Sequence, residues 1–150
     1  MIIWLFGQPC SGKTTLAHLL QDEMQEKGLN PIIIDGDEFR KVFNDKSYGK
    51  DARLKNVERA MNVAKYLESM GHSVICSFVT PYKSMRYDIK HMIPDVNFVY
   101  LTYEGKRGRE DYHVKDFEIP NPKEEDFLNL STSKFTEADC LSLIKFKFKI

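Results

Sequence analysis

A short glycine-rich segment near the start of the chain has the residue types and spacing that hold a phosphate chain. It runs from Gly7 to Thr14 and fits the pattern G-x-x-x-x-G-K-[ST] at every fixed position. In such a loop, backbone N–H groups and the N-terminus of the following helix converge on phosphate oxygens. Lys13 is expected to reach the β and γ phosphates, the Thr14 hydroxyl to ligate Mg²⁺, and Thr15 to support the α phosphate. The predicted ATP-binding residues are Gly7, Gln8, Pro9, Cys10, Ser11, Gly12, Lys13, Thr14 and Thr15.

Two carboxylates follow the apolar run Ile32–Ile34, one on each side of Gly36. In a doubly wound sheet, ligands bind at the carboxyl ends of the strands, so Asp35 and Asp37 are expected to face the same crevice as the glycine-rich loop. A carboxylate there can hold Mg²⁺ through water and accept a proton from an attacking hydroxyl. The alternative is an Asp-Gly turn that caps a helix beginning near Glu38.

A second anion site is indicated by three side-chain donors downstream. Arg40 follows Asp37 by three residues, and Arg53 and Asn56 lie three apart, on one face near the start of a long helix. Guanidinium groups match the oxygens of sulfate and phosphate, so the three together predict a pocket for a second anion. Taken one at a time, each arginine is more often a solvated surface charge.

The third apolar run continues into Ser77–Tyr82, again at the carboxyl end of a predicted strand. Exposed main-chain groups there, fixed by Pro81, are expected to hydrogen-bond a base or ribose, with Phe78 packed beneath it. An ordinary strand-to-helix turn is the alternative.

The elements that position these residues alternate between strand and helix. Helical spacing begins at Lys13 and stops at Gly28, and a long amphipathic helix with an apolar stripe is predicted over Val57–Met70. Such alternation predicts βαβ units around a mostly parallel sheet, hence an α/β fold. The predicted strands are residues 2–6, 31–35, 73–78 and 97–103.

The last third of the chain is less regular. Residues 104–123 are rich in charge and contain two prolines, which predicts a loop that could serve as a lid. Thr136 and Asp139 resemble a capping box and predict a final helix. The alternating segment Lys145–Ile150 is strand-like, with a frayed tail as the alternative.

Composition narrows the function classes. The chain has 150 residues, 17.5 kDa, with 22 basic and 22 acidic residues. That length fits a single domain, residues 1–150, and the balanced charge gives no global field for nucleic acid or an anionic membrane. Its apolar runs are too short to span a bilayer. The three cysteines, Cys10, Cys76 and Cys140, lack metal-ligand or redox spacing, so we expect a reducing cytoplasm.

Four of these segments, in order and in spacing, resemble the signatures of adenylylsulfate (APS) kinases. They are residues 7–15, Asp35–Arg40, Arg53-x-x-Asn56 and Ser77–Tyr82, and the resemblance covers about residues 1–90. It implies a three-layer α/β/α P-loop kinase fold and usually a homodimer. The implied activity is phosphorylation of the ribose 3′-hydroxyl of APS with MgATP, in sulfate assimilation.

The resemblance also implies roles for individual residues. Asp37 matches an aspartate that activates the 3′-hydroxyl and helps to organise Mg²⁺, and the donors after it match residues that hold the phosphosulfate. Tyr48 stands where the family has a phenylalanine that stacks on the APS adenine, and Tyr112 is a candidate for the ring's second face. Thr80 stands in place of a serine discussed as a phosphoryl acceptor. The expected APS-binding residues are Asp37, Arg40, Tyr48, Arg53, Asn56, Phe78, Val79, Thr80 and Tyr112; Lys13 and Asp37 are the expected catalytic residues, and Thr14 and Asp37 the expected Mg²⁺ ligands.

The chain also departs from the family pattern. Gln8, Pro9 and Cys10 alter the interior of the loop, and the basic lid is shortened to residues 104–112, where Arg107 or Arg109 would have to replace lost cations. Two other functions therefore stay open. One is a P-loop kinase of another small metabolite, such as a sugar or nucleoside, which has no use for the second anion pocket. The other is a lid-less nucleotide-binding module that regulates a partner without turnover.

Overall fold

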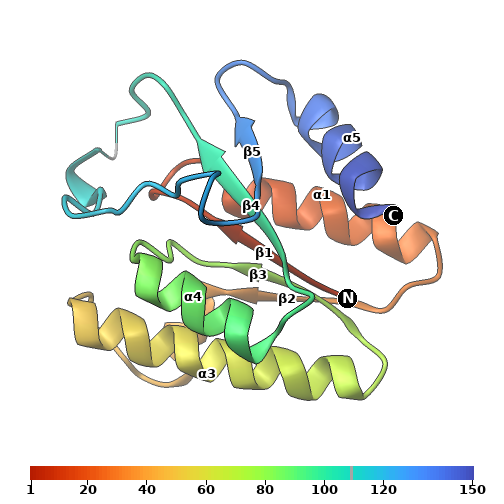
Figure 1. Cartoon of the computed structure of the whole chain (residues 1–150), viewed down its shortest axis with the longest axis horizontal. Helices are drawn as coiled ribbons and strands as arrows, with labels where there is room; N and C mark the ends of the chain where they lie inside the picture. The colour runs from red at the N-terminus through yellow and green to blue at the C-terminus, as the bar shows by residue number, and fades with distance from the viewer. Residues whose placement is uncertain (109) are drawn as a thin grey trace.

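The apolar run Ile2–Phe6 forms strand β1, at the middle of a parallel sheet (Figure 1). The computed structural model describes residues 1–108 and 110–150, so the candidate lid cation Arg109 lies outside the described residues. Over the described residues the sheet has five strands, all parallel, in the order β2-β3-β1-β4-β5. The other strands are β2 (Pro31–Asp35), β3 (Ser73–Ser77), β4 (Asn97–Thr102) and β5 (Leu128–Ser131).

Side-chain alternation along β1 divides the core into two layers. Trp4 and its even-numbered neighbours pack against α3 (Lys50–Ser69) and α4 (Lys83–Met92), whereas Leu5 and Ile3 pack against α1 (Lys13–Glu26) and α5 (Glu137–Phe148). Figure 1 shows α1 and α5 on one side of the sheet and α3 and α4 on the other. Because every residue of β1 is buried, the strand reads as one continuous apolar run. The predicted three-layer α/β/α fold is confirmed.

Strand register places the candidate chemistry at one edge of the sheet. Asp35 pairs with Ser77 and Ser77 with Leu5, so strands β2, β3 and β1 reach their carboxyl ends side by side. Helix α2 (Gly36–Val42) starts directly at this edge, and its N-cap is the Asp35 side chain, which accepts from the backbone N–H groups of Asp37 and Glu38. The helix-capping interpretation of the Asp-Gly segment is therefore confirmed, and the segment also lies at the carboxyl edge of the sheet, where its interpretation as a ligand site would require it.

The end of the chain differs from the prediction. Residues 145–148 continue helix α5 instead of forming a strand or a frayed tail. The helix starts with the predicted capping box at Thr136, and Ile144 is fully buried against the sheet. Lys145 forms an ion pair with Glu23 of α1 at 2.5 Å. Tertiary contacts of this kind favour a helix here, although the local alternation of lysine and phenylalanine favours a strand.

Two further elements had no separate prediction, α4 and β5. The irregular segment after β4 contains one short 3₁₀ turn, Glu110–Tyr112. Over the described part of the chain, no helix is long and apolar enough to cross a membrane.

Candidate active site

A cavity of about 780 Å³ opens at the carboxyl edge of the sheet, beside the glycine-rich loop. It brings together residues from five separate segments of the chain. All nine expected APS-binding residues lie on its wall, along with Lys13 and Thr14. The complete lining is Pro9, Cys10, Lys13, Thr14, Asp35, Gly36, Asp37, Arg40, Tyr48, Arg53, Asn56, Val57, Ser77, Phe78, Val79, Thr80, Pro81 and Tyr112.

Lys13 is folded back onto the loop that precedes it. Its Nζ donates to the carbonyl oxygens of Gly7 at 3.1 Å and Gln8 at 2.9 Å, and lies 3.4 Å from the Ser11 hydroxyl. Burial lowers the pKa of this ammonium from its ordinary value to about 8, with Asp35 opposing the shift. Burial therefore weakens the preference of Lys13 for its charged form, and a bound phosphate chain would favour that form again.

Backbone geometry shows why this loop needs glycine. Gly7 has φ 147°, and a Cβ added there would meet the carbonyl oxygen of Leu101 at 2.2 Å. Gly12 has φ 98° and stands as the N-cap of α1. Cys10 also lies in the left-handed region, at φ 65°, although it carries a side chain.

Thr14 contacts a carboxylate across the crevice. Its Oγ1 donates to Asp35 Oδ2 at 3.1 Å, while Asp35 Oδ1 caps α2. A hydroxyl and a carboxylate oxygen are the hard ligands that Mg²⁺ prefers. The residues therefore fit a metal, and the structure adds Asp35 to the expected pair of Thr14 and Asp37.

The opposite wall of the large cavity carries the residues that are expected to bind APS. The guanidinium carbon of Arg40 lies 4.4 Å from the centre of the Tyr48 ring, and that of Arg53 lies 5.7 Å from it. Arg53 also donates through Nε to the Tyr48 carbonyl at 3.0 Å. Burial, followed by repulsion from Arg40, lowers the pKa of Arg53. Two cations held this close indicate a site shaped for an anion.

Buried polar atoms in this wall are left without partners. Over the described residues, Arg40 Nε and Asn56 Oδ1 have no hydrogen-bond partner, although the two side chains are only 7% and 1% exposed. Buried donors and acceptors in native proteins are nearly always paired, so these atoms point to a missing ligand or water. Asp37 is different, because its side chain is 76% exposed and its Oδ1 lies 3.9 Å from Arg40 Nη1.

Thr80 forms part of the cavity floor. It is 1% exposed and adopts φ 47°, a strained conformation for a β-branched residue. Its hydroxyl accepts from the Trp4 indole at 2.9 Å and donates to the Phe78 carbonyl at 3.4 Å. Arg86 donates to the Thr80 carbonyl at 3.1 Å. Because its hydroxyl both accepts and donates a hydrogen bond within the protein, Thr80 is better suited to a structural role in the cavity wall than to accepting a phosphoryl group.

Phe78 has a similar position between core and cavity. It is 4% exposed, packs on Trp4 and Phe39 at ring distances of 5.3 and 6.3 Å, and also lines the large cavity. The expected stacking residues, Tyr48 and Tyr112, are by contrast well exposed.

The rest of the glycine-rich loop faces elsewhere. Gly12 and Thr15 line a smaller cavity of about 210 Å³ together with Arg107 and Thr132, on the α1–α5 side. Gln8 and Ser11 line another of about 180 Å³ beneath the shortened lid. Eight of the nine expected ATP-binding residues are therefore divided among three hollows, with Pro9 and Cys10 shared by two of them, while Gly7 lines none of the three.

Sequence reasoning placed Asp35 at the crevice, but its spacing did not say which of the two aspartates would meet Thr14. Two supporting residues were missed. Trp4 and Arg86 hold Thr80 from positions distant in sequence, and no local pattern marks such contacts.

Comparison with known proteins identifies a family for this chain. The family described as adenylylsulphate kinase matches residues 1–107. A probable adenylyl-sulfate kinase of Aeropyrum pernix is 32% identical over 117 residues, covering 77% of this chain and 64% of that protein. The chain spans only about half the length of two other matching relatives, 50% and 49%.

Solved structures show the same fold. An APS kinase of Mycobacterium tuberculosis in complex with AMPPNP and APS superposes with a TM-score of 0.86 at 21% identity, covering 99% of this chain and 97% of that one. An unliganded sugar kinase of Janibacter sp. superposes with a TM-score of 0.76 at 18% identity, covering 99% and 94%. At these identities, the likeness extends to the arrangement of strands and helices alone.

Proposed function

The chain belongs to the adenylylsulphate kinase family, and we propose that it is a single P-loop kinase domain that phosphorylates the ribose 3′-hydroxyl of adenylylsulfate. The products are 3′-phosphoadenylylsulfate (PAPS) and ADP. One observation carries the acceptor assignment: the large cavity contains Arg40 and Arg53 beside Tyr48, with buried polar atoms left unpaired. An anionic adenine nucleotide supplies both the charge and the aromatic face that this wall matches.

The donor nucleotide fits on the other side of the loop. Its phosphates follow the backbone N–H groups from Gly7 to Thr14, where Lys13 is already placed. Its nucleoside part fits the smaller cavity lined by Gly12, Thr15 and Arg107. The two substrates then meet at Lys13 and Thr14, which line the large cavity as well.

In this proposal Thr14 and Asp35 hold Mg²⁺. Asp37, which the sequence also predicts as a ligand, is assigned instead to the acceptor hydroxyl. When bound, the metal neutralises charge on the β and γ phosphates. Lys13 adds a second positive charge on the same oxygens, and leaves the loop carbonyls to do so. These charges act where negative charge develops in the transition state.

Asp37 is the proposed base. The acceptor 3′-oxygen attacks the γ-phosphorus, the bond from that phosphorus to ADP breaks, and the hydroxyl proton passes to the Asp37 carboxylate. Its exposure to the cavity suits this role, since it must reach a bound hydroxyl rather than a protein partner.

The deciding experiment measures ADP release from MgATP with APS as acceptor, beside adenosine, gluconate and no acceptor, with PAPS identified directly. We expect PAPS formation that needs both substrates and that disappears in Lys13→Ala. Turnover on another hydroxyl would remove the APS assignment and support a different metabolite kinase. ATP binding without acceptor-dependent turnover would instead support the regulatory module.

A further inference from the structure

Gln8 pairs with a segment that follows the shortened lid in the chain. Its Nε2 donates to the Val114 carbonyl at 2.9 Å, and its Oε1 accepts from the Val114 N–H at 2.8 Å. One carboxamide thus satisfies both backbone groups of one residue, as a neighbouring strand would. The backbone carbonyl of the same Gln8 accepts from Lys13. A single loop residue therefore contacts the cation of the phosphate site and residues 112–118, which we call the strap.

The far end of the strap is fixed to the acceptor side of the cavity. The Tyr82 hydroxyl contacts both carboxylate oxygens of Asp116, at 3.0 and 3.1 Å. Glu118 donates through its N–H to the Pro81 carbonyl at 2.8 Å and accepts at Oε1 from the Lys83 N–H. These contacts join the strap to the turn between β3 and α4, next to Thr80.

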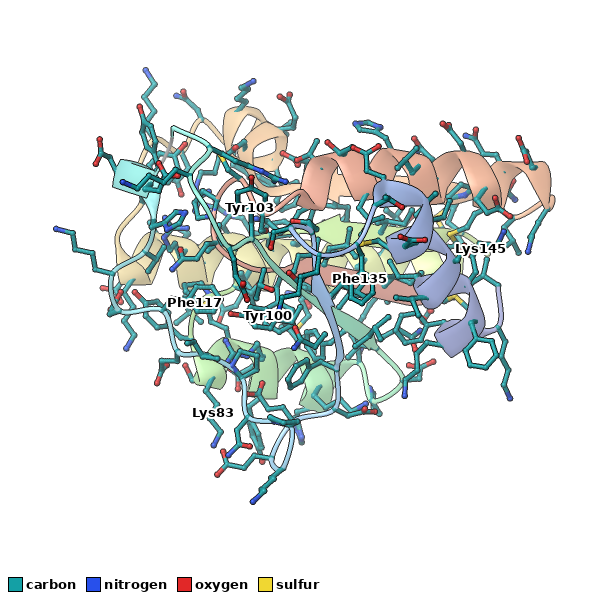
Figure 2. The ribbon with its side chains drawn as sticks, turned by 90° about the horizontal axis from the view of Figure 1, so that it is seen from above. Lys83, Tyr100, Tyr103, Phe117, Phe135 and Lys145 are labelled. Atoms are coloured by element: carbon teal, nitrogen blue, oxygen red, sulfur yellow. The ribbon has the colours of Figure 1, made fainter. Side chains whose placement is uncertain are left out.

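The middle of the strap packs on the sheet. The ring of Phe117 stacks on Tyr100 of β4 with ring centres 6.0 Å apart. Both residues are labelled in Figure 2. From Asp116 onward the strap is thus held by hydrogen bonds and by an aromatic contact. At the other end of the strap, Tyr112 is 72% exposed, whereas His113 and Val114 are half-buried. The hydrogen-bonded pair of Gln8 and Val114, two residues from Tyr112, connects this end of the strap to the glycine-rich loop.

We propose that Gln8 is a positioning residue: by pairing with both backbone groups of Val114 it holds the strap across the site and keeps Tyr112 on the wall of the large cavity. Tyr112 then faces the acceptor without a mobile lid having to close. The part of this proposal that concerns the acceptor rests on the proposed function, whereas the part that concerns the strap does not.

The test compares Gln8→Leu, which keeps the side-chain length and removes both hydrogen bonds, with Gln21→Leu. Gln21, on α1, is a matched control, because its carboxamide makes one long contact, 3.5 Å, to the Pro31 carbonyl of β2. Hydrogen exchange is measured on peptides that contain Val114 and needs no substrate. We expect exchange at Val114 to accelerate roughly tenfold in Gln8→Leu only, with α1 unchanged. Equal exchange in both variants would overturn the proposal.

Steady-state kinetics test the positioning role. We expect Gln8→Leu to raise the KM for APS roughly tenfold and to leave the KM for ATP within about twofold. In a Tyr112→Ala background the same substitution is expected to add little, because both act on one wall. An unchanged KM for APS, or a parallel rise in both KM values, would contradict the role. If the unaltered protein does not use APS, the proposed function fails while the exchange result still decides whether Gln8 holds the strap.

Discussion

Thr14 and Asp35 face each other across the crevice, 3.1 Å apart, and Asp35 is at the same time the N-cap of α2. The glycine-rich loop is thereby linked to the helix that carries Asp37 and Arg40. A shift of Asp35 would displace the proposed metal site and the proposed acceptor site together, so we expect this contact to influence the distance over which a phosphoryl group moves.

Replacing Asp35 with asparagine separates its two roles. Asn caps a helix as well as Asp does, so the free energy of unfolding of Asp35→Asn should stay within about 0.5 kcal/mol of the parent. Loss of the charge next to Thr14 should raise the Mg²⁺ concentration needed for half-maximal activity about 10- to 100-fold. Urea unfolding and a Mg²⁺ titration of PAPS formation measure the two effects. A normal Mg²⁺ requirement would remove Asp35 from the metal site.

Asp37→Asn should behave in the opposite way. If Asp37 takes the acceptor proton, kcat should fall roughly 10²- to 10⁴-fold while the Mg²⁺ requirement stays within about threefold. The two variants differ by only two positions in the chain, so each serves as the control for the other. A large rise in the Mg²⁺ requirement of Asp37→Asn, with little change in kcat, would exchange the two assignments.

The buried ammonium of Lys13 should make nucleotide binding sensitive to pH. In the protein without nucleotide, burial lowers the pKa of Lys13 to about 8. Bound phosphates favour the charged form and raise this pKa. Binding therefore takes up a proton above pH 8, and the affinity for ATP should fall up to tenfold per pH unit. Calorimetry between about pH 7.5 and 9.5 tests this, with Lys13→Arg as the control, because a guanidinium stays charged throughout. A flat profile for the parent protein would show that Lys13 remains fully charged without nucleotide.

Most of the fold could be predicted from the sequence, because its strands are short apolar runs that are followed by turn residues. β1 is buried on both faces and ends at Gly7, which a local pattern can reveal. β5 could not be found in this way, since only Leu130 of its four residues is fully buried. The segment from Lys145 was misread because alternation favours a strand locally, while its contacts with α1 favour a helix.

The candidate site was predictable where one motif carries several groups and not where distant segments meet. Lys13 and Thr14 follow from the loop pattern alone. The pairing of Gln8 with Val114 joins residues more than one hundred positions apart, and a single sequence holds no signal for it. Asp35 and Asp37 share one motif, but which of them approaches Thr14 depends on the register of β2 against β3.

Thr80 should affect stability more than chemistry. Thr80→Val leaves the Trp4 indole N–H buried without a partner and should lower the free energy of unfolding by about 1–3 kcal/mol. Thr80→Ser keeps the hydroxyl and relieves β-branched strain at φ 47°, so it should stay within about 0.5 kcal/mol of the parent. The protein has one tryptophan, so fluorescence during urea unfolding reports directly on this contact. Equal stability of the two variants would mean that the hydrogen bond contributes nothing.

Substitution of Arg53 tests whether the large cavity binds a second anion. Arg53 is half-buried, stands near Arg40, and has its pKa lowered by burial, so the unliganded protein gains little from holding it there. A bound phosphosulfate would offset the repulsion between the two guanidinium groups. Arg53→Ala should therefore weaken APS binding by about 2 kcal/mol, roughly 30-fold in Kd, and leave ATP binding unchanged.

Lys55 provides the matched control for this experiment. It is an exposed cation on the same helix, and it lies outside the lining of the large cavity. Because an exposed charge contributes little to binding, Lys55→Ala should change the Kd for APS by less than about threefold. Calorimetric titration of APS into both variants gives the comparison at one ionic strength. Equal affinities would make Arg53 a surface charge and would leave Arg40 alone to hold the acceptor anion.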